Sequence, residues 1–80
     1  MLDELKSARK VVGVKQLRRA LNAGTVRKAF LAGDADPRLT EPLAEQCAAL
    51  GVECVPVPSM KELGKAAGID IGAAAAGILR

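Results

Sequence analysis

Three cationic side chains lie close together in the segment Gly13–Asn22, namely Lys15, Arg18 and Arg19. At roughly 100° per residue they fall on one side of an amphipathic helix, and the apolar side chains fall on the other. Cations at the start of a helix oppose its dipole, at a cost of roughly a few tenths of a kcal/mol. The placement becomes favourable where a polyanion docks against this end, because the backbone N–H groups, the dipole and the cations then attract the same partner.

The charge of the chain is divided unevenly along its length. The formal net charge is +3, but residues 1–30 hold eight Lys and Arg against two Asp and Glu, which gives +6. Residues 31–80 hold four Lys and Arg against seven Asp and Glu, which gives −3. Such asymmetry is typical of a basic face that binds an anionic partner, although an ordinary solvated surface can also produce it.

The residue types that are missing exclude several kinds of site. The chain has one Phe and no Trp or Tyr, whereas proteins that bind single strands stack the bases on such rings. It has no His and only two cysteines, which argues against a zinc site with four ligands. We therefore expect no metal and no cofactor, and we interpret Cys47 and Cys54 as small buried hydrophobic residues in a reducing cytosol.

An enzymatic function would have to rely on Asp, Glu or Lys. The close acidic pair Asp34 and Asp36 lies in a loop before a helix, where acids are favoured for capping and turns. We therefore expect no catalytic activity, and binding of Mg²⁺ or Mn²⁺ at this pair would argue for an enzyme instead. Gly64, Gly68 and Gly72 recur every four residues, which we interpret as helix ends and turns because a phosphate-binding loop follows a strand.

The length of 80 residues predicts a single small domain, residues 1–80, with one modest core. The first residues carry charge throughout, which does not resemble a signal peptide. The apolar runs are far shorter than the roughly 20 residues that span a bilayer. We expect a soluble, cytoplasmic monomer that does not engage a membrane.

Apolar periodicity and turn signals predict short helices that alternate with short strands. Helices are expected at Leu2–Ala8 and Val14–Ala23, from the N-cap Thr40 to Leu50, and from a capping box at Ser59–Glu62 to Ala67. Strands are expected at Val11–Val12, Val26–Ala32, Val52–Val57 and Ala73–Leu79. Units this short indicate an α/β fold, a compact three-layer α/β/α sandwich around a four-stranded mixed sheet.

Four segments, taken in order along the chain, form one recognisable series: Gly13–Gln16 with Arg19, Ala23–Lys28, Asp34–Pro37 and Val57–Gly68. Together they resemble the kink-turn RNA-binding ribosomal proteins of the L7Ae and L30e type, and especially the small bacterial members of that family. The resemblance covers nearly the whole chain, and its last segment is the most specific. It implies a non-catalytic protein that binds structured RNA, ribosomal or other, in a ribonucleoprotein connected with translation.

The resemblance also implies which RNA feature is recognised, a sharp bend stabilised by tandem sheared G·A pairs. In the family, a Gly-x-Asn-Glu-x-x-Lys motif places a helix N-terminus against those pairs. By position, Lys15 replaces the Asn, Gln16 replaces the Glu and Arg19 replaces the Lys. Gln16 can accept and donate at a base edge but lacks the strong acceptor of a carboxylate. Lys15 is a point charge in place of an amide, which suits a phosphate better than a base.

A second family contact is an apolar loop that covers a nucleotide flipped out of the stack. By position this loop is Gly68–Ala73, with Ile69 and Ile71 between glycines. Exposed aliphatic side chains at a tight turn need a reason, and an extruded base would offer its flat face to them. The alternative is that both isoleucines pack into the core.

The expected RNA contacts are Gly13, Lys15, Gln16, Arg18, Arg19, Arg27, Lys28, Ile69, Asp70 and Ile71. If the cations make about three to five phosphate contacts, the logarithm of the association constant falls with the logarithm of the salt concentration at a slope of roughly −3 to −4. The alternative function is that of a protein-interaction or scaffolding member of the same fold that does not bind RNA. The cationic face at residues 15–19 argues against that alternative.

Overall fold

Helices and strands alternate along the chain in a computed structural model that describes residues 9–80. The elements are β1 (Lys10–Val12), α2 (Val14–Asn22), β2 (Val26–Ala32), α3 (Pro37–Leu50), β3 (Glu53–Val57), α4 (Met60–Ala66) and β4 (Ala75–Leu79). Each element lies within a few residues of its predicted position. The helix predicted at Leu2–Ala8 falls outside the described residues.

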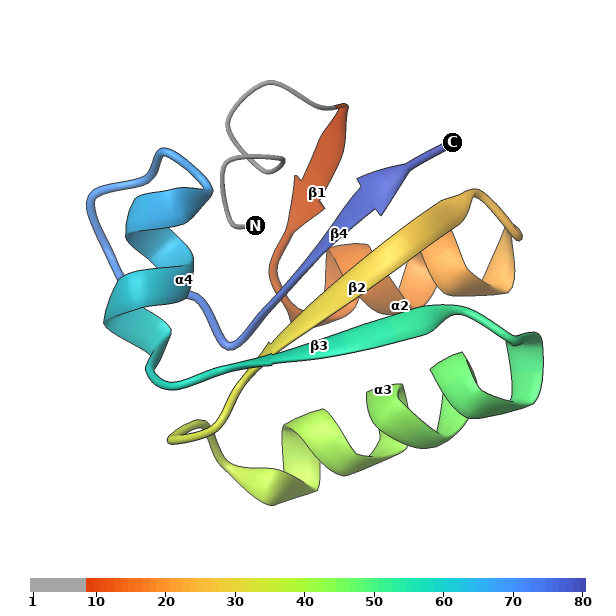
Figure 1. Cartoon of the computed structure of the whole chain (residues 1–80), viewed down its shortest axis with the longest axis horizontal. Coiled ribbons are helices and arrows are strands. Elements are labelled where there is room, and N and C mark those ends of the chain that lie inside the picture. Colours follow the sequence, from red (N-terminus) through yellow and green to blue (C-terminus); the bar gives the residue numbers. More distant parts are fainter. Residues whose placement is uncertain (1–8) are drawn as a thin grey trace.

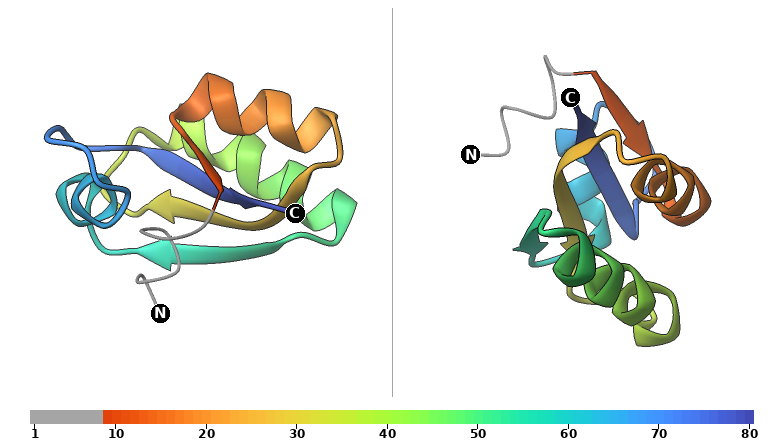
Figure 2. Two further views of the ribbon diagram at one scale, coloured as in Figure 1. Left: turned by 90° about the horizontal axis from the view of Figure 1, so that it is seen from above. Right: turned by 90° about the vertical axis from the view of Figure 1, so that its right-hand side faces the viewer.

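The four strands form one mixed sheet in the order β1-β4-β2-β3. Strand β4 runs antiparallel to both β1 and β2, whereas β2 and β3 are parallel. Helices α2 and α3 cover one face of this sheet, and α4 covers the other (Figures 1 and 2). The predicted three-layer α/β/α arrangement with a four-stranded mixed sheet is therefore confirmed.

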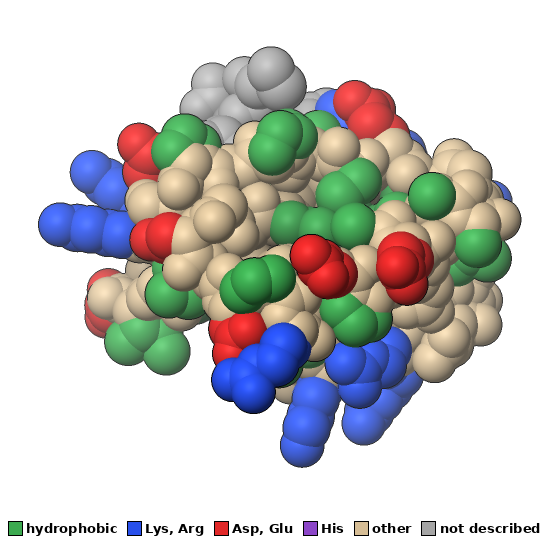
Figure 3. All heavy atoms as spheres, turned by 90° about the horizontal axis from the view of Figure 1, so that it is seen from below, with side chains coloured by type: hydrophobic (Ala, Val, Ile, Leu, Met, Phe, Trp, Pro, Cys, Tyr) green, Lys and Arg blue, Asp and Glu red, His purple; other side chains and the backbone are tan. Residues whose placement is uncertain are grey.

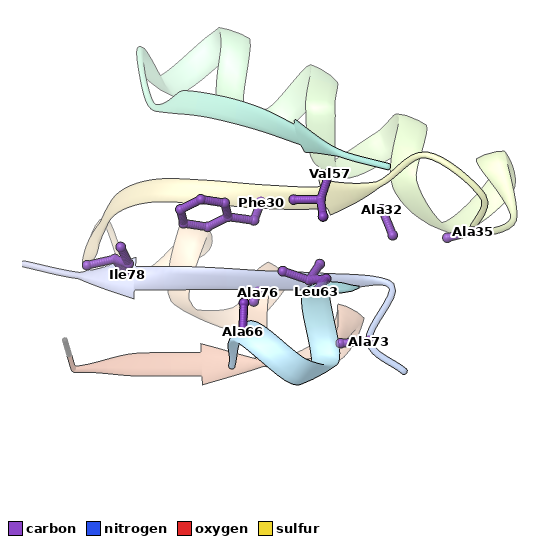
Figure 4. Packing of buried hydrophobic residues seen from close by; sticks show 9 residues of the cluster. All are labelled: Phe30, Ala32, Ala35, Val57, Leu63, Ala66, Ala73, Ala76 and Ile78. Atoms are coloured by element: carbon purple, nitrogen blue, oxygen red, sulfur yellow. The ribbon is translucent and has the colours of Figure 1, made fainter. Parts of the chain in front are cut away.

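Each face of the sheet has its own apolar cluster. On the α4 side, Phe30 is fully buried and packs with Leu63, Ala66, Ala76 and Ile78 (Figure 4). The opposite cluster joins α2 and α3 to the sheet through Leu17, Ala20, Leu21, Val26, Ala29, Leu43, Cys47 and Ala75. Since the chain has a single aromatic residue, these layers are filled mainly by aliphatic side chains.

Strand β4 lies between two neighbours and is covered on both faces, which explains its small residues. A Cβ atom at Gly77 would lie 2.6 Å from Cδ1 of Leu17 on α2. Gly77 and Ala75, two residues earlier in the α2-side cluster, thus let α2 approach the sheet closely.

Helix α3 begins four residues earlier than the sequence predicts, counted from N-cap to N-cap. Its N-cap is Asp36, whose carboxylate accepts a hydrogen bond from the backbone N–H of Arg38 at 2.9 Å, and Pro37 opens the helix. The expected N-cap Thr40 is wrong because Asp36 and Pro37 supply the stronger pair, an acceptor side chain followed by a residue with a preset φ and no N–H. Pro42 consequently lies inside the helix.

The remaining helix and strand limits follow from caps and pairing. Ser59 caps α4 as predicted, since its hydroxyl oxygen accepts from the N–H of Glu62 at 3.1 Å. Strand β4 begins at Ala75, two residues later than expected, because residues 73 and 74 still belong to the connection from α4. Cys47 is buried as predicted, but Cys54 is exposed. The expectation for Cys54 is wrong because β3 is an edge strand and leaves part of its length uncovered.

Strand β3 has one open edge, and a proline lies on it. The carbonyl oxygen of Val57 accepts from Gly33 N at 2.7 Å, so Val57 directs its polar backbone atoms toward β2. Peptide groups in a parallel strand alternate between the two sides. The nitrogen of Pro56 therefore faces the open edge, where it offers no N–H to a further strand.

Candidate nucleic-acid interface

The start of α2 is an open helix end formed by a glycine. Gly13 is the N-cap with φ 114° and ψ 157°, and no side chain caps the helix or places an acid in its first turn. The φ of Gly13 favours glycine, and a Cβ atom there would push the Oε1 atom of Gln16 out of its position. The first N–H groups of the helix and the amide of Gln16 are thus available to a polar partner at this end.

A cationic hollow of about 330 Å³ lies along the outer surface of α2 and is lined by Lys15, Arg18, Arg19 and Asn22. All four side chains are exposed. The side-chain oxygen Oδ1 of Asn22 accepts a hydrogen bond from Nε2 of Gln46 on α3 at 2.6 Å. Because the side-chain oxygen of Asn22 is used in this bond, its NH2 group remains as a hydrogen-bond donor at the surface. The sequence does not predict the bond between Asn22 and Gln46, since the two residues are far apart along the chain.

The connection between α4 and β4, residues 68–74, is named here the apolar loop. Ile71 projects from it with 75% of its surface exposed, which agrees with the expected exposure. Ile69 is partly buried and packs against the cluster around Phe30, so the two isoleucines do not share one environment. Asp70 between them is exposed.

The helix start and the apolar loop lie at the same end of the sheet. The backbone N–H of Gly13 donates to the carbonyl oxygen of Ala75 at 2.8 Å, where the apolar loop enters β4. At the same level, Ala75 is paired with Leu31 near the end of β2. The start of α2 and the connection from α4 to β4 therefore lie at the same end of the sheet (Figure 1).

Two of the predicted contact residues, Arg27 and Lys28, lie at the other end of that sheet. They belong to the start of β2, where Val26 is paired with Leu79 at the far end of β4. The side chain of Lys28 is 14% exposed and lies 3.9 Å from the carboxylate of Glu53. The structure therefore does not bring these two cations together with the start of α2.

The two close aspartates both accept hydrogen bonds at helix starts, Asp36 at α3 and Asp34 at α4. Asp36 caps α3 and forms an ion pair with Arg38 at 2.9 Å. Hydrogen bonds from the side chain and then from the backbone of Arg38 hold the pKa of Asp36 below its ordinary value. Asp34 accepts from the backbone N–H of Met60 at 2.7 Å. Within residues 9–80, no group of three or more His, Cys, Asp and Glu side chains is arranged to hold a metal ion.

A second hollow, of about 540 Å³, lies between α3 and the ends of β2 and β3 and differs in charge from the first. Its walls are mostly apolar, and its ionisable residues include Asp34 and Glu41. Figure 3 shows hydrophobic side chains with acidic ones among them on this face of the molecule, and Lys and Arg toward its margin. Acidic side chains repel phosphate, so this side is unsuited to a nucleic-acid backbone.

The two cysteines lie on this side of the sheet as well. Burial, followed by repulsion from the Cys54 thiolate, raises the pKa of Cys47 to about 11. Although Cys54 is exposed, the atoms around its thiol desolvate it in part, and this raises the pKa of Cys54 as well. Neither thiol has the depressed pKa of a reactive nucleophile.

Among the helices of residues 9–80, none is both long enough and apolar enough to cross a bilayer.

Comparisons of sequence and of structure both find similarity to proteins named as RNA-binding or ribosomal proteins. The chain is 41% identical over 78 residues to an RNA-binding protein of Bacillus pumilus, which covers 96% of this chain and 95% of the relative. It is 35% identical over 83 residues to the large ribosomal subunit protein eL8 of Halobacterium salinarum, which covers 98% and 69% of the two chains. The 15.5kD RNA binding protein of Giardia lamblia superposes with a TM-score of 0.89 at 26% identity, over 99% of this chain and 70% of that one.

A family model accounts for nearly the whole chain. The model of the ribosomal protein L7Ae/L30e/S12e/Gadd45 family matches residues 2–80. The match includes the start of α2, its cationic hollow and the apolar loop. The chain therefore belongs to the ribosomal protein L7Ae/L30e/S12e/Gadd45 family.

Proposed function

We propose that this protein is a non-catalytic RNA-binding domain that recognises a kink-turn through the start of α2 and the apolar loop. One observation carries the proposal: the uncapped start of α2, which bears Lys15 in its first turn, and a protruding aliphatic side chain lie at the same end of the sheet, joined by the bond from Gly13 to Ala75. Two relatives and a structural neighbour named as RNA-binding or ribosomal proteins support the partner class.

The cationic hollow is proposed to hold the RNA backbone. Lys15, Arg18 and Arg19 are exposed and approach one shallow surface, which fits a row of phosphates because contacts of this kind position a protein without reading sequence. The Asn22 amide, held from α3 by Gln46, adds a neutral donor to the same surface.

Gln16 is proposed to read a base edge at the bend. Its side chain lies over Gly13 at the uncapped end of α2, and an amide can both accept and donate to the edge of a purine. A carboxylate at this position would accept only, so glutamine changes the hydrogen-bond pattern without abolishing it.

The apolar loop is proposed to cover a base that has left the stack. A kink-turn presents such a base, and a flat base face buries apolar area against an exposed aliphatic side chain. Ile71 is the main contact, Ile69 supports the loop from the core side, and Asp70 lies at the edge of the contact. Arg27 and Lys28 are assigned to the periphery because they lie at the other end of the sheet.

A binding titration tests the proposal directly. One RNA carries a kink-turn with tandem G·A pairs, and the control carries Watson–Crick pairs at those positions and is straight. We expect one protein chain per bend and a dissociation constant at least tenfold lower for the bent RNA at physiological salt, about 1.4 kcal/mol. Equal affinity for both RNAs would contradict kink-turn recognition and leave only general electrostatic binding.

A further inference from the structure

We propose that Asp34 is a positioning residue for Ile71 and acts through Met60. The proposal rests on the function proposed above, because Ile71 matters only if the apolar loop contacts RNA. Asp34 lies between β2 and α3, distant in sequence from the apolar loop. It reaches that loop through two successive hydrogen bonds.

The first bond connects Asp34 to the start of α4. Its Oδ1 accepts from the backbone N–H of Met60, the first residue of that helix, at 2.7 Å. Ser59 satisfies the N–H of Glu62 in the same turn. Helix α4 thus has two side-chain caps, one local and one contributed from 26 residues away, and a carboxylate at this end also suits the helix dipole.

The second bond connects Met60 to the apolar loop. Its carbonyl oxygen accepts from the backbone N–H of Ala73 at 3.0 Å. Gly72 packs against the same residue, and a Cβ atom there would lie 3.1 Å from Cβ of Met60. Met60 therefore donates its N–H to Asp34, and it contacts the loop through its carbonyl oxygen and its side chain.

These contacts determine where the Ile71 side chain points. A Cβ atom at Gly64 would overlap the carbonyl oxygen of Ile71, so this part of the loop lies directly on the backbone of α4. The backbone of Ile71 faces the helix, and its side chain is left 75% exposed. An aliphatic side chain held in this way loses little conformational freedom on binding, which favours affinity.

Loss of the Asp34 carboxylate should loosen the first turn of α4 and, with it, the hold on Ala73. Ile71 would remain present but would have to be ordered when the RNA binds. We therefore expect Asp34→Ala to weaken binding to the kink-turn RNA by about three- to tenfold. Asp34→Asn keeps an oxygen acceptor at the same position and should retain most of the affinity.

A double-mutant cycle with Ile71→Ala distinguishes this role from a general structural one. If Asp34 acts only through the loop, the double variant binds as weakly as Ile71→Ala alone, and the two losses do not add. Asp36→Ala is the matched control, since it removes an N-cap aspartate from α3 in the same connection without touching α4. Losses that add in full in the double variant would overturn the proposal.

Amide hydrogen exchange in the free protein tests the same proposal without RNA. The Ala73 amide should exchange at least threefold faster in Asp34→Ala than in the natural sequence. Its exchange rate should be unchanged in Asp36→Ala. Unaltered exchange of the Phe30 amide shows that the fold is intact. If Ala73 exchange does not respond, the role of Asp34 is excluded whatever the RNA result. If it responds but the natural protein fails to select the bent RNA, the RNA function fails and, with it, the role assigned to Ile71.

Discussion

The backbone N–H of Gly13 donates to the carbonyl oxygen of Ala75 at 2.8 Å, so the first turn of α2 and the entrance of β4 are joined without any side chain. A backbone bond of this kind keeps its geometry when nearby side chains are replaced. The relative position of the cationic hollow and the apolar loop is thus built into the sheet. Single substitutions on either element can be interpreted as local effects for this reason.

Gly13→Ala should destabilise the protein and weaken RNA binding together. The φ of 114° is unfavourable for alanine, and the new Cβ would displace the Gln16 amide. We expect a loss of about 1–2 kcal/mol in the free energy of unfolding, measured by thermal denaturation. Gly24→Ala is the control, because Gly24 has φ 73° with no atom within 4 Å of its Cβ position. Gly24→Ala should lower the stability of the protein, but its folded molecules should bind the RNA with unchanged affinity.

Arg19→Ala should reduce binding to the kink-turn RNA by about 1–3 kcal/mol in a mobility-shift titration. Arg19 lines the cationic hollow, whereas Arg27 is equally exposed but lies at the other end of the sheet. Arg27→Ala should therefore cost less than about 0.5 kcal/mol. Equal losses for the two variants would show that the chain binds RNA by its overall charge.

The salt dependence of binding should report the number of phosphates near the cationic hollow. With Lys15, Arg18 and Arg19 as the contacts, the logarithm of the association constant should fall with the logarithm of salt at a slope of roughly −2 to −3. This is shallower than the slope expected when Arg27 and Lys28 are included. Arg18→Ala should reduce the slope by about 1, and a slope that stays unchanged would remove Arg18 from the backbone contact.

Ile71→Ala should leave stability nearly unchanged and weaken RNA binding by about 1 kcal/mol. The side chain is largely exposed in the free protein, so little apolar burial is lost from the fold. Leu50→Ala is a matched control, because Leu50 is 50% exposed and lies at the end of α3. An equal loss of affinity in Leu50→Ala would argue against a specific contact at the apolar loop.

The thiols should give a stability change confined to alkaline pH. Folding raises the pKa of Cys47 from 9.0 to about 11, so the folded state retains a proton that the unfolded state releases. This contribution is complete below pH 9, and it is lost as the pH rises through about 11. Denaturant titrations at a series of pH values should show the decline, and Cys47→Ala should reduce it. A decline of equal size in that variant would assign it to another group.

Local signals predicted much of the fold. The capping box at Ser59 and the alternation of helices and strands both depend on neighbours in sequence. The start of α3 was harder, because Asp36 with Pro37 and Thr40 with Glu41 and Pro42 both resemble a helix start, and only the structure shows which is used. The exposure of Cys54 depended on strand order, which no local pattern contains.

The candidate site was predicted in its parts but not in its assembly. The cationic face of α2 follows from helical periodicity, whereas the exposure of Ile71 was expected from the family resemblance, with packing into the core as the alternative. Arg27 and Lys28 follow α2 closely along the chain, but α2 runs from the level of Ala75 to the other end of the sheet, where β2 begins. The bond from Asp34 to Met60 spans two elements and has no signal in sequence, since an aspartate in a loop is ordinary there.

Pro56 on the outer strand has a consequence for how the protein behaves when it is concentrated. An edge strand that lacks a backbone N–H in its middle is a poor template for pairing with a strand of a second molecule. Intermolecular β-sheet growth along β3 would therefore be interrupted at Pro56. Replacing this proline with valine would restore the missing donor to a β-branched, apolar segment. We expect this replacement to cause aggregation of the folded protein at high concentration rather than unfolding.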